Sequence, residues 1–407
     1  MTRICRPRPL VVAAALLVLP ALVSACSGAY PNSTFTHFTD FNRDTTSLWN
    51  ILLGWGTAVF IVVEGILIWA MIRYRRRPGS AEPEHVHGNT MLELTWTLAP
   101  AVILVFIAVP TVRVIFKTQA AAPAGSLQVE VIGHQWWWEF RYPEHGITTA
   151  NELYLPIGRT VNFAIRTNDV IHSFWIPQLG GKRDAVSNRT NYLWFTPDSV
   201  GEMAFNGTCN EYCGTSHANM RLRAFTVSPE NFDKWVAHQK APASFGVATV
   251  QPAAAIAPMA EPYSFPRDRV PDHVMPKTPV PAGLTFPENV LAAGDPQRGM
   301  QIYSRSACIG CHKVRGNPTS LGVTGPDLTH IASRLTIAAG LYPNDARHLA
   351  LWIKNARRMK PMSSGLSMPT LGIGEADPFS KVKATANLGG LTDEQIADIV
   401  AYLMQLK

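Results

Sequence analysis

The stretch CNEYCGTSHANM, from Cys209 to Met220, places two thiols, a carboxylate, an imidazole and a thioether within twelve residues. Cysteines this close together could form a disulfide loop if the protein is exported to an oxidising compartment. Thiolate and thioether sulfur also select soft copper, and imidazole binds copper as well. The stretch therefore predicts either a small disulfide loop or a copper cage, and the rest of the chain has to decide between them.

An export signal is predicted over residues 1–25. Arginines in the first eight residues precede the apolar run 10–25, which ends in small residues before Cys26. The sequence VSAC at this point resembles the lipobox of bacterial lipoproteins, so we expect Cys26 to become a lipidated first residue. An ordinary cleaved signal with a leftover thiol is the alternative, and Cys5 would be lost in either case.

Two further apolar runs, residues 48–72 and 94–116, are each long enough to cross a hydrocarbon core, which needs about 20 helical residues. They predict a transmembrane helical hairpin over 48–117, after an exported segment at 26–47. Arginines at 73, 75, 76 and 77 place the loop between the helices in the cytoplasm. Everything after the hairpin is therefore expected on the periplasmic side of a bacterial inner membrane.

The net charge of +7 would suit a nucleic-acid partner, but a chain exported across a membrane seldom meets nucleic acid, so we expect membrane lipid and no nucleic acid. The charge is unevenly divided. Residues 126–237 hold 9 Lys and Arg against 11 Asp and Glu, a net of −2, whereas residues 290–407 hold 13 against 8, a net of +5. The two exterior segments should attract each other.

Three exterior regions follow the hairpin. Residues 118–237 contain short β-rich runs, such as LQVEVIG and TVNFAIRT, separated by Gly, Pro and Asn, and predict an all-β sandwich or Greek-key barrel. Residues 238–287 are rich in Ala and Pro and predict an extended linker. Residues 288–407 predict a small all-α domain, in which TDEQ provides a capping box from Thr392 to Gln395 before an apolar helical stripe.

The helical domain contains CIGCH at 308–312, the attachment pattern of a c-type haem. Cys308 and Cys311 would hold the macrocycle, and His312 would ligate the iron. A zinc-binding or redox-active Cys pair is the alternative. For the sixth ligand of the iron we favour Met368, because SMPT at 367–370 resembles the Met-Pro loop of class I cytochromes c. The sequence GPDL at 325–328 likewise resembles their haem-packing segment. Met362 is the second candidate for this ligand, and Met359 is a third.

The all-β region offers the missing ligand for the first stretch. The sequence DVIHSFW supplies His172, so one ligand would come from an early strand and the others from a late loop. Copper sites on Greek-key barrels are built in this way. The candidate copper ligands from the side chains are His172, Cys209, Cys213, His217 and Met220.

Four motifs together resemble cytochrome c oxidase subunit II: GHQWWWEFRYP at 133–143, NDVIHSFWIP at 168–177, GKRDAVSNR at 181–189 and CNEYCGTSHANM at 209–220. The resemblance also covers both membrane helices, through ELTWTLAPAVILVFIAVP. The helical domain behind it resembles the fused variant of that family, which carries a class I cytochrome c on the same chain. The implied fold is a two-helix transmembrane hairpin, an all-β cupredoxin-like Greek-key barrel and a small all-α cytochrome c domain.

The resemblance implies a binuclear copper A centre. Cys209 and Cys213 would bridge two coppers, His172 and His217 would be imidazole ligands, Met220 a weak ligand, and Glu211 would bind through its backbone carbonyl. The Glu211 side chain would reach a magnesium ion shared with subunit I. This reading is preferred over a disulfide loop, which would explain neither His172 nor Met220.

The resemblance also assigns single residues outside the copper set. Trp136 matches the exposed tryptophan through which subunits II receive electrons, although a core role is the plain alternative, and Trp138 is expected to pack inside. Glu93 matches a glutamate near the mouth of a proton channel, or is an ordinary interfacial carboxylate. Glu64, deep in the first membrane helix, should face a protein partner.

The predicted function is that of the subunit through which electrons enter a respiratory haem-copper oxidase, from the c-type haem to the copper pair and on to subunit I, which reduces oxygen and translocates protons. Subunits I and III, and cytochrome c or a quinol-cytochrome c reductase as donor, are the implied partners. The alternatives are a carrier serving a nitrogen-oxide reductase and a stand-alone membrane-tethered carrier. A quinol oxidase is disfavoured because its subunit II lacks the copper ligands.

Overall fold

The structure, a computed structural model, describes residues 30–79, 82, 85, 87–243, 263–363 and 367–407. The chain divides into two units, Met1–Ser33 and Thr34–Lys407, and every element described below lies in the second. The expected export signal, with Cys5 and the lipidation site Cys26, lies outside the described residues.

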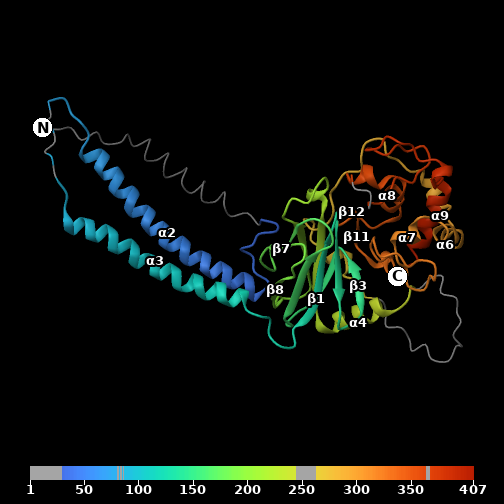
Figure 1. Cartoon of the computed structure of the whole chain (residues 1–407), viewed down its shortest axis with the longest axis horizontal. Helices are drawn as coiled ribbons and strands as arrows, with labels where there is room; N and C mark the ends of the chain where they lie inside the picture. The colour runs from blue at the N-terminus through green and yellow to red at the C-terminus, as the bar shows by residue number, and fades with distance from the viewer. Residues whose placement is uncertain (1–29, 80–81, 83–84, 86, 244–262, 364–366) are drawn as a thin grey trace. The chain divides into compact units, whose positions relative to one another are not determined.

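The two membrane-spanning helices are α2 (Asp40–Arg73) and α3 (Thr90–Gln119), which lie side by side (Figure 1). The side chains of Thr39 and Asn89 cap their N-termini. Helix α2 begins before the apolar run, directly after its cap Thr39. The Thr39 hydroxyl also donates to the carbonyl of Leu179, at 2.6 Å, and so joins the start of the helix to the β domain. Both helices are long and apolar enough to cross a membrane.

Two five-stranded sheets form the β domain and pack face to face as a sandwich. The first has the order β3 (Ile147–Ala150), β2 (Trp137–Tyr142), β1 (Leu127–His134), β5 (Val161–Thr167) and β8 (Asn191–Phe195). The second has the order β4 (Glu152–Pro156), β10 (Arg221–Val227), β9 (Met203–Cys209), β6 (His172–Trp175) and β7 (Arg183–Ala185). The pairs β1–β5 and β4–β10 are parallel, and the other pairs are antiparallel.

Aromatic side chains fill the space between the two sheets. Trp138, Phe140 and Phe163 from the first sheet meet Phe174 from the second, with ring centroids 5.5 to 6.3 Å apart. Helix α4 (Pro229–Lys240), capped by Ser228, closes one end of the sandwich by stacking Trp235 on Tyr154 at 4.8 Å. It extends beyond residue 237, where the β region was expected to end.

The C-terminal domain is helical, as the sequence predicts. Its elements are α5 (Glu288–Ala292), α6 (Pro296–Tyr303), α7 (Cys308–Cys311), β11 (Thr336–Ile337), β12 (Tyr342–Pro343), α8 (Ala346–Met359) and α9 (Asp393–Leu403), with short 3-10 turns between them, and the linker before it holds the turn Arg267–Arg269. Thr392 and Gln395 form the predicted capping box. Helices α6 and α9 cross closely because Gly299 has no side chain; a Cβ there would lie 1.9 Å from the Asp398 carbonyl oxygen.

Candidate metal centre and adjoining cavity

Two buried thiols lie together at one end of the second sheet. Cys209 is the last residue of β9, and Cys213 lies in the loop that leads to the 3-10 turn His217–Asn219. Their Sγ atoms are 3.8 Å apart and neither is in a disulfide, whose sulfur atoms would be about 2 Å apart. The disulfide loop therefore does not form, and the two sulfurs face a common space.

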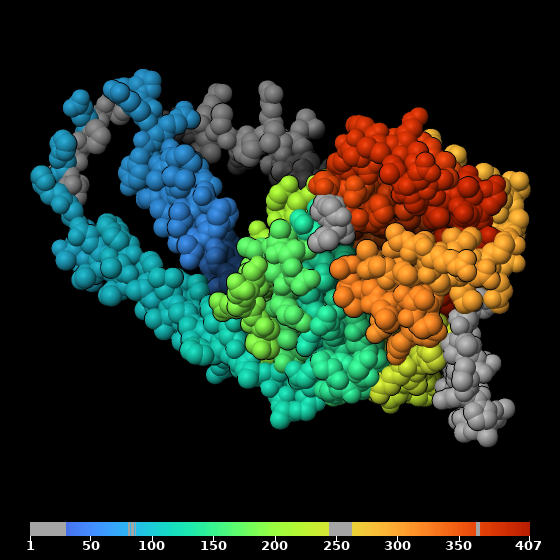
Figure 2. Space-filling model, turned by 45° about the vertical axis from the view of Figure 1, so that its right-hand side comes forward, coloured from blue at the N-terminus to red at the C-terminus, as the bar shows by residue number. Residues whose placement is uncertain are grey.

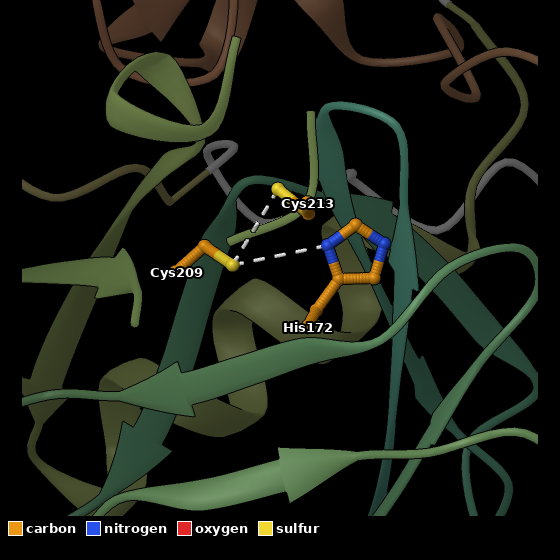
Figure 3. Close-up of side chains that lie close together, drawn as sticks. All are labelled: His172, Cys209 and Cys213. Atoms are coloured by element: carbon orange, nitrogen blue, oxygen red, sulfur yellow. Dashed lines mark hydrogen bonds between the residues drawn. The ribbon is translucent and has the colours of Figure 1, made fainter. Parts of the chain in front are cut away.

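The remaining predicted ligand atoms surround these two sulfurs. The Nδ1 atom of His172 is 3.8 Å from Cys209 Sγ. Figure 3 shows this ring nitrogen turned toward the Cys209 sulfur. On the other side, His217 Nδ1 is 3.6 Å and Met220 Sδ is 3.9 Å from Cys213 Sγ. The carbonyl oxygen of Glu211 is 3.2 Å from Cys209 Sγ. All six residues predicted for the copper set are therefore brought together.

Strand pairing explains this convergence. Strand β6 pairs with β9 so that Phe174 is opposite Cys209, which places the preceding His172 beside the thiols. The backbone N–H of Cys209 donates to the carbonyl of Met220 at 3.0 Å, so the loop between them closes on itself. Gly133 of β1 makes room for the imidazole, because a Cβ there would lie 2.6 Å from Cδ2 of His172.

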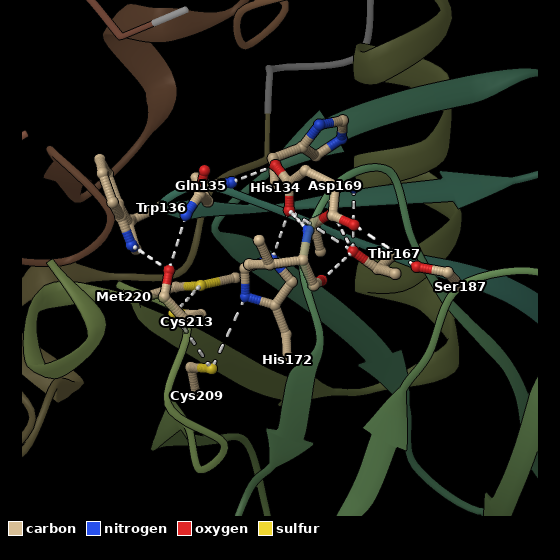
Figure 4. A network of polar contacts seen from close by, with 12 residues as sticks. His134, Gln135, Trp136, Thr167, Asp169, His172, Ser187, Cys209, Cys213 and Met220 are labelled. Atoms are coloured by element: carbon tan, nitrogen blue, oxygen red, sulfur yellow. Dashed lines mark hydrogen bonds and ion pairs between the residues drawn. The ribbon is translucent and has the colours of Figure 1, made fainter. Parts of the chain in front are cut away.

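Asp169 orients the buried His172 ring. Its Oδ1 atom is 2.7 Å from His172 Nε2, which leaves Nδ1 facing the thiols (Figure 4). Oδ2 accepts from the backbone N–H of Gln135, also at 2.7 Å. Partial burial opposes ionisation of Asp169, but the hydrogen bonds from His172 and Gln135 outweigh it and lower the pKa of Asp169. A carboxylate on the outer nitrogen of an imidazole is the usual support of a metal ligand.

Each of the two thiols shifts the pKa of the other. The hydrogen bond from Cys213 lowers the pKa of Cys209, against the effect of burial, and His172 adds to this lowering. The same bond and the negative charge on Cys209 raise the pKa of Cys213. A soft cation would bind both sulfurs in their thiolate form.

Trp136 is buried, whereas the resemblance led us to expect an exposed tryptophan. Its side chain is 2% exposed, and its Nε1 donates to the carbonyl of Cys213 at 2.9 Å. The covering groups come from the C-terminal domain, where Nζ of the equally buried Lys360 donates to the Trp136 carbonyl at 2.5 Å. Trp138 is fully buried and lies edge-on to His172 at 5.9 Å, which confirms its expected place in the core.

A cavity lies between Trp136 and the CIGCH motif. Its lining includes Cys308, Cys311 and His312 from the C-terminal domain, and Gln135, Trp136 and Trp137 from the β domain. Nδ1 of His312 donates to the carbonyl of Pro326 at 2.9 Å, so the GPDL segment fixes the ring and leaves Nε2 free to ligate. Partial burial lowers the pKa of His312, which favours the neutral imidazole that binds a metal.

The cavity lining suits a haem with its propionates. Apolar side chains dominate it, the charged residues among the described lining are Arg334 and Lys360, and the lining includes no Asp or Glu. Met362 and Met368 both line the cavity, and Met362 is the more buried of the two. Met359 instead lies in the core of the helical domain, with its carbonyl bound by the hydroxyl of Tyr342.

The two membrane carboxylates lie apart from these groups. Glu93 is in the first turn of α3 and is exposed, and Glu64 is in the middle of α2. Sequence reasoning missed Asp169 and Lys360. The only sequence signal for Asp169 was its position three residues before His172, and nothing local marks Lys360 as a contact of Trp136.

Comparison with known proteins matches three parts of the chain. Residues 39–114 match the family "Cytochrome C oxidase subunit II, transmembrane domain", residues 145–227 match "Cytochrome C oxidase subunit II, periplasmic domain", and residues 296–407 match "Cytochrome c". Cytochrome c oxidase subunit 2 of Alkalihalophilus pseudofirmus is 32% identical over 355 residues, covering 86% of this chain and 83% of that protein. The subunit 2 of Bacillus subtilis is 28% identical over 365 residues, covering 85% and 88%.

Among solved structures, the periplasmic domain of subunit II of cytochrome oxidase of Bradyrhizobium japonicum is 29% identical, with a TM-score of 0.28. The match between the two covers 30% of this chain and 97% of the solved domain.

Proposed function

The chain belongs to the cytochrome c oxidase subunit II family, and from this premise we propose which residues hold its redox groups. It is a subunit of a haem-copper terminal oxidase, with a fused cytochrome c domain, and electrons enter the oxidase through it. Two transmembrane helices anchor the periplasmic domains. The family membership implies a copper A site, and the cytochrome c domain implies a c-type haem.

The six converging residues are our proposed copper ligands. The observation that carries this assignment is the pair of unoxidised, buried sulfurs 3.8 Å apart, with His172 Nδ1 and His217 Nδ1 each within 3.8 Å of one of them. Thiolates, imidazoles and a thioether form a donor set suited to copper. When bound, the copper pair and the haem supply one-electron redox chemistry. The β sandwich supplies a rigid frame, and Asp169 holds His172 in the ligating tautomer.

For the haem we propose Cys308 and Cys311 as the covalent attachment and His312 as an axial ligand. We propose Met368 as the sixth ligand, with Met362 as the second candidate, because both line the cavity. The half-buried His312 ring is already fixed by the carbonyl of Pro326, so its ligating nitrogen needs little reorganisation.

Trp136 is the proposed electron path between the two groups. It contributes to the wall of the haem cavity while its indole N–H binds the carbonyl of Cys213, a proposed copper ligand. One buried side chain therefore contacts both sites, which supports transfer within the chain.

Further proposals concern the complex. The exposed Glu211 side chain is available for a magnesium ion shared with subunit I, and Glu93 for the mouth of a proton channel. Subunit I would carry the oxygen-reducing site and couple it to proton translocation, with subunit III as a further partner. Cytochrome c or a quinol-cytochrome c reductase would deliver electrons to the haem. Membership of the oxidase family favours this reading over a nitrogen-oxide reductase or a stand-alone carrier.

Metal and haem analysis of the purified full chain, with electron paramagnetic resonance, tests the proposal. We expect two coppers and one covalent haem per chain. A Cys209→Ser variant should lose the mixed-valence copper signal and keep the haem, and the matched Cys308→Ser variant should keep the copper signal and lose covalent haem attachment at that thiol. A copper-free chain with Cys209 and Cys213 joined in a disulfide would overturn the copper assignment.

A further inference from the structure

The described part of the Ala/Pro-rich linker is packed on the β domain. We call residues 263–274 the strap. The backbone N–H of Phe265 donates to the hydroxyl of Tyr154 at 3.1 Å, and the Phe265 ring stacks on Phe225 at 4.9 Å. Asn206 of β9 donates to the carbonyl of His273 at 2.9 Å. Phe265 and Val274 are almost completely buried, so the strap restricts the freedom of the domain that follows it.

Arg223 of β10 connects the strap to the cytochrome c domain. It is 3% exposed, its Nε donates to the carbonyl of Val274 at 2.7 Å, and its Nη2 donates to the carbonyl of Gly340 at 2.9 Å. Burial lowers the pKa of Arg223 to about 10, so it is charged at neutral pH. A Cβ at Gly340 would lie 2.9 Å from Nη1 of Arg223, so the contact is close.

Glu152 of β4 makes the second connection. It lies beside Arg223 in the register of the parallel strands β4 and β10 and is 2% exposed. Its Oε1 accepts from the backbone N–H groups of Leu335 and Thr336, at 2.8 and 2.9 Å, and from the Thr336 hydroxyl at 3.1 Å. Two buried ionisable side chains of the β domain therefore bind one short segment, residues 335–340, of the cytochrome c domain.

Such contacts are typical of a permanent interface. A buried ionisable side chain is tolerated only when its polar atoms are hydrogen-bonded, so removing its partners is strongly destabilising. The partners here are backbone groups of the other domain. Thr215 and Ser363 add a hydrogen bond of 2.7 Å across the same interface, and Figure 2 shows the two domains in direct contact.

We propose that Glu152 and Arg223 form a docking clamp that holds the cytochrome c domain in one fixed position on the copper-binding β domain. The clamp keeps the face that carries Trp136 covered by the chain's own haem domain and closed to a separate donor protein. This proposal rests on the proposed function for the role of Trp136, but the docking itself can be measured independently. Donors would then reach the chain through the haem domain alone.

Acylation of lysines in the purified full chain, followed by mass spectrometry, tests the clamp. Lys360 is 2% exposed and lies at the interface, whereas Lys182 and Lys383 are exposed on the two domains. We expect Lys360 to react at least about tenfold more slowly than Lys182 and Lys383. Equal reaction rates in the wild-type chain would overturn the proposal.

Variants show which residues hold the interface. Combining Glu152→Gln with Arg223→Met should raise the Lys360 rate toward that of Lys383. The matched control combines Glu130→Gln with Arg166→Met, which removes a surface pair, with 3.1 Å between Nη2 and Oε2, on the opposite sheet and should leave Lys360 protected. A folded clamp variant with unchanged protection would overturn the role of these two residues. If that variant does not fold, the wild-type result alone decides whether the domain is docked.

Copper content and the paramagnetic signal of the same samples separate this proposal from the proposed function. A chain without copper that protects Lys360 would contradict the copper assignment and support the docking. A chain that binds copper but whose Lys360 reacts freely would support the copper assignment and contradict the docking.

Discussion

Trp136 donates its indole N–H to the backbone carbonyl of Cys213 at 2.9 Å, and the same side chain contributes to the wall of the cavity beside CIGCH. The tryptophan that the resemblance presents as an external electron acceptor is thus an internal contact in this chain. The cytochrome c domain covers it, with Lys360 bound to its carbonyl.

A Trp136→Phe variant should slow electron transfer between the haem and the copper centre, because it removes the hydrogen bond to Cys213 and part of the ring. Flash photoreduction of the haem, followed by optical detection of copper reduction, measures the rate. Trp175→Phe is the matched control, because the Trp175 indole donates to the Gly180 carbonyl at 3.1 Å and does not line the cavity. An unchanged rate in Trp136→Phe would contradict the path.

An Asp169→Asn variant should bind copper about 10- to 100-fold more weakly, because His172 loses its charged partner. Titration against a competing copper chelator measures the affinity. Asp198→Asn, which changes a carboxylate paired with Arg43 at the surface, should leave the affinity unchanged. Equal losses in both variants would indicate a general effect on folding.

A Met368→Ala variant should lose the optical signature of a methionine–iron bond and lower the haem potential, since a thioether ligand raises it. Met362→Ala should retain the signature. The two cavity-lining methionines are each other's control, and the reverse pattern would assign the sixth position to Met362.

Acid should weaken the folded chain through the buried His330, whose ring lies 4.5 Å from that of His238. Burial and the neighbouring His238 lower the pKa of His330 from 6.5 to about 4, so the folded state binds fewer protons than the unfolded state. Its contribution is fully present above pH 6.5 and is lost as the pH falls toward 4, by roughly 3 kcal/mol in all. Denaturant unfolding of the wild type and His330→Asn between these pH values tests this.

The variant should show a smaller loss of stability in acid than the wild type. His273→Asn, which replaces an exposed histidine, should keep the wild-type slope. Identical slopes for wild type and His330→Asn would show that other groups control the acid sensitivity.

Local sequence was enough to predict the membrane helices and the capping box of α9, and it supplies the motif on which the proposed haem attachment rests. Each depends on residues close together in the chain, through apolar length, the spacing of Cys308, Cys311 and His312, or the pairing of Thr392 with Gln395. The candidate copper ligands were also predicted, first from the soft donors between Cys209 and Met220 and then from the resemblance, but not from local structure, because His172 lies 37 residues before Cys209.

Tertiary structure alone decided how the domains meet. Strand register placed Glu152 beside Arg223, and packing then brought residues 335–340 onto both, at separations of more than 100 residues. The linker composition predicted an extended segment, yet Phe265 and Val274 are buried on the β domain. Composition and periodicity report what a segment can form by itself, whereas the burial of Trp136 and Lys360 depends on surfaces contributed by segments far apart in the chain.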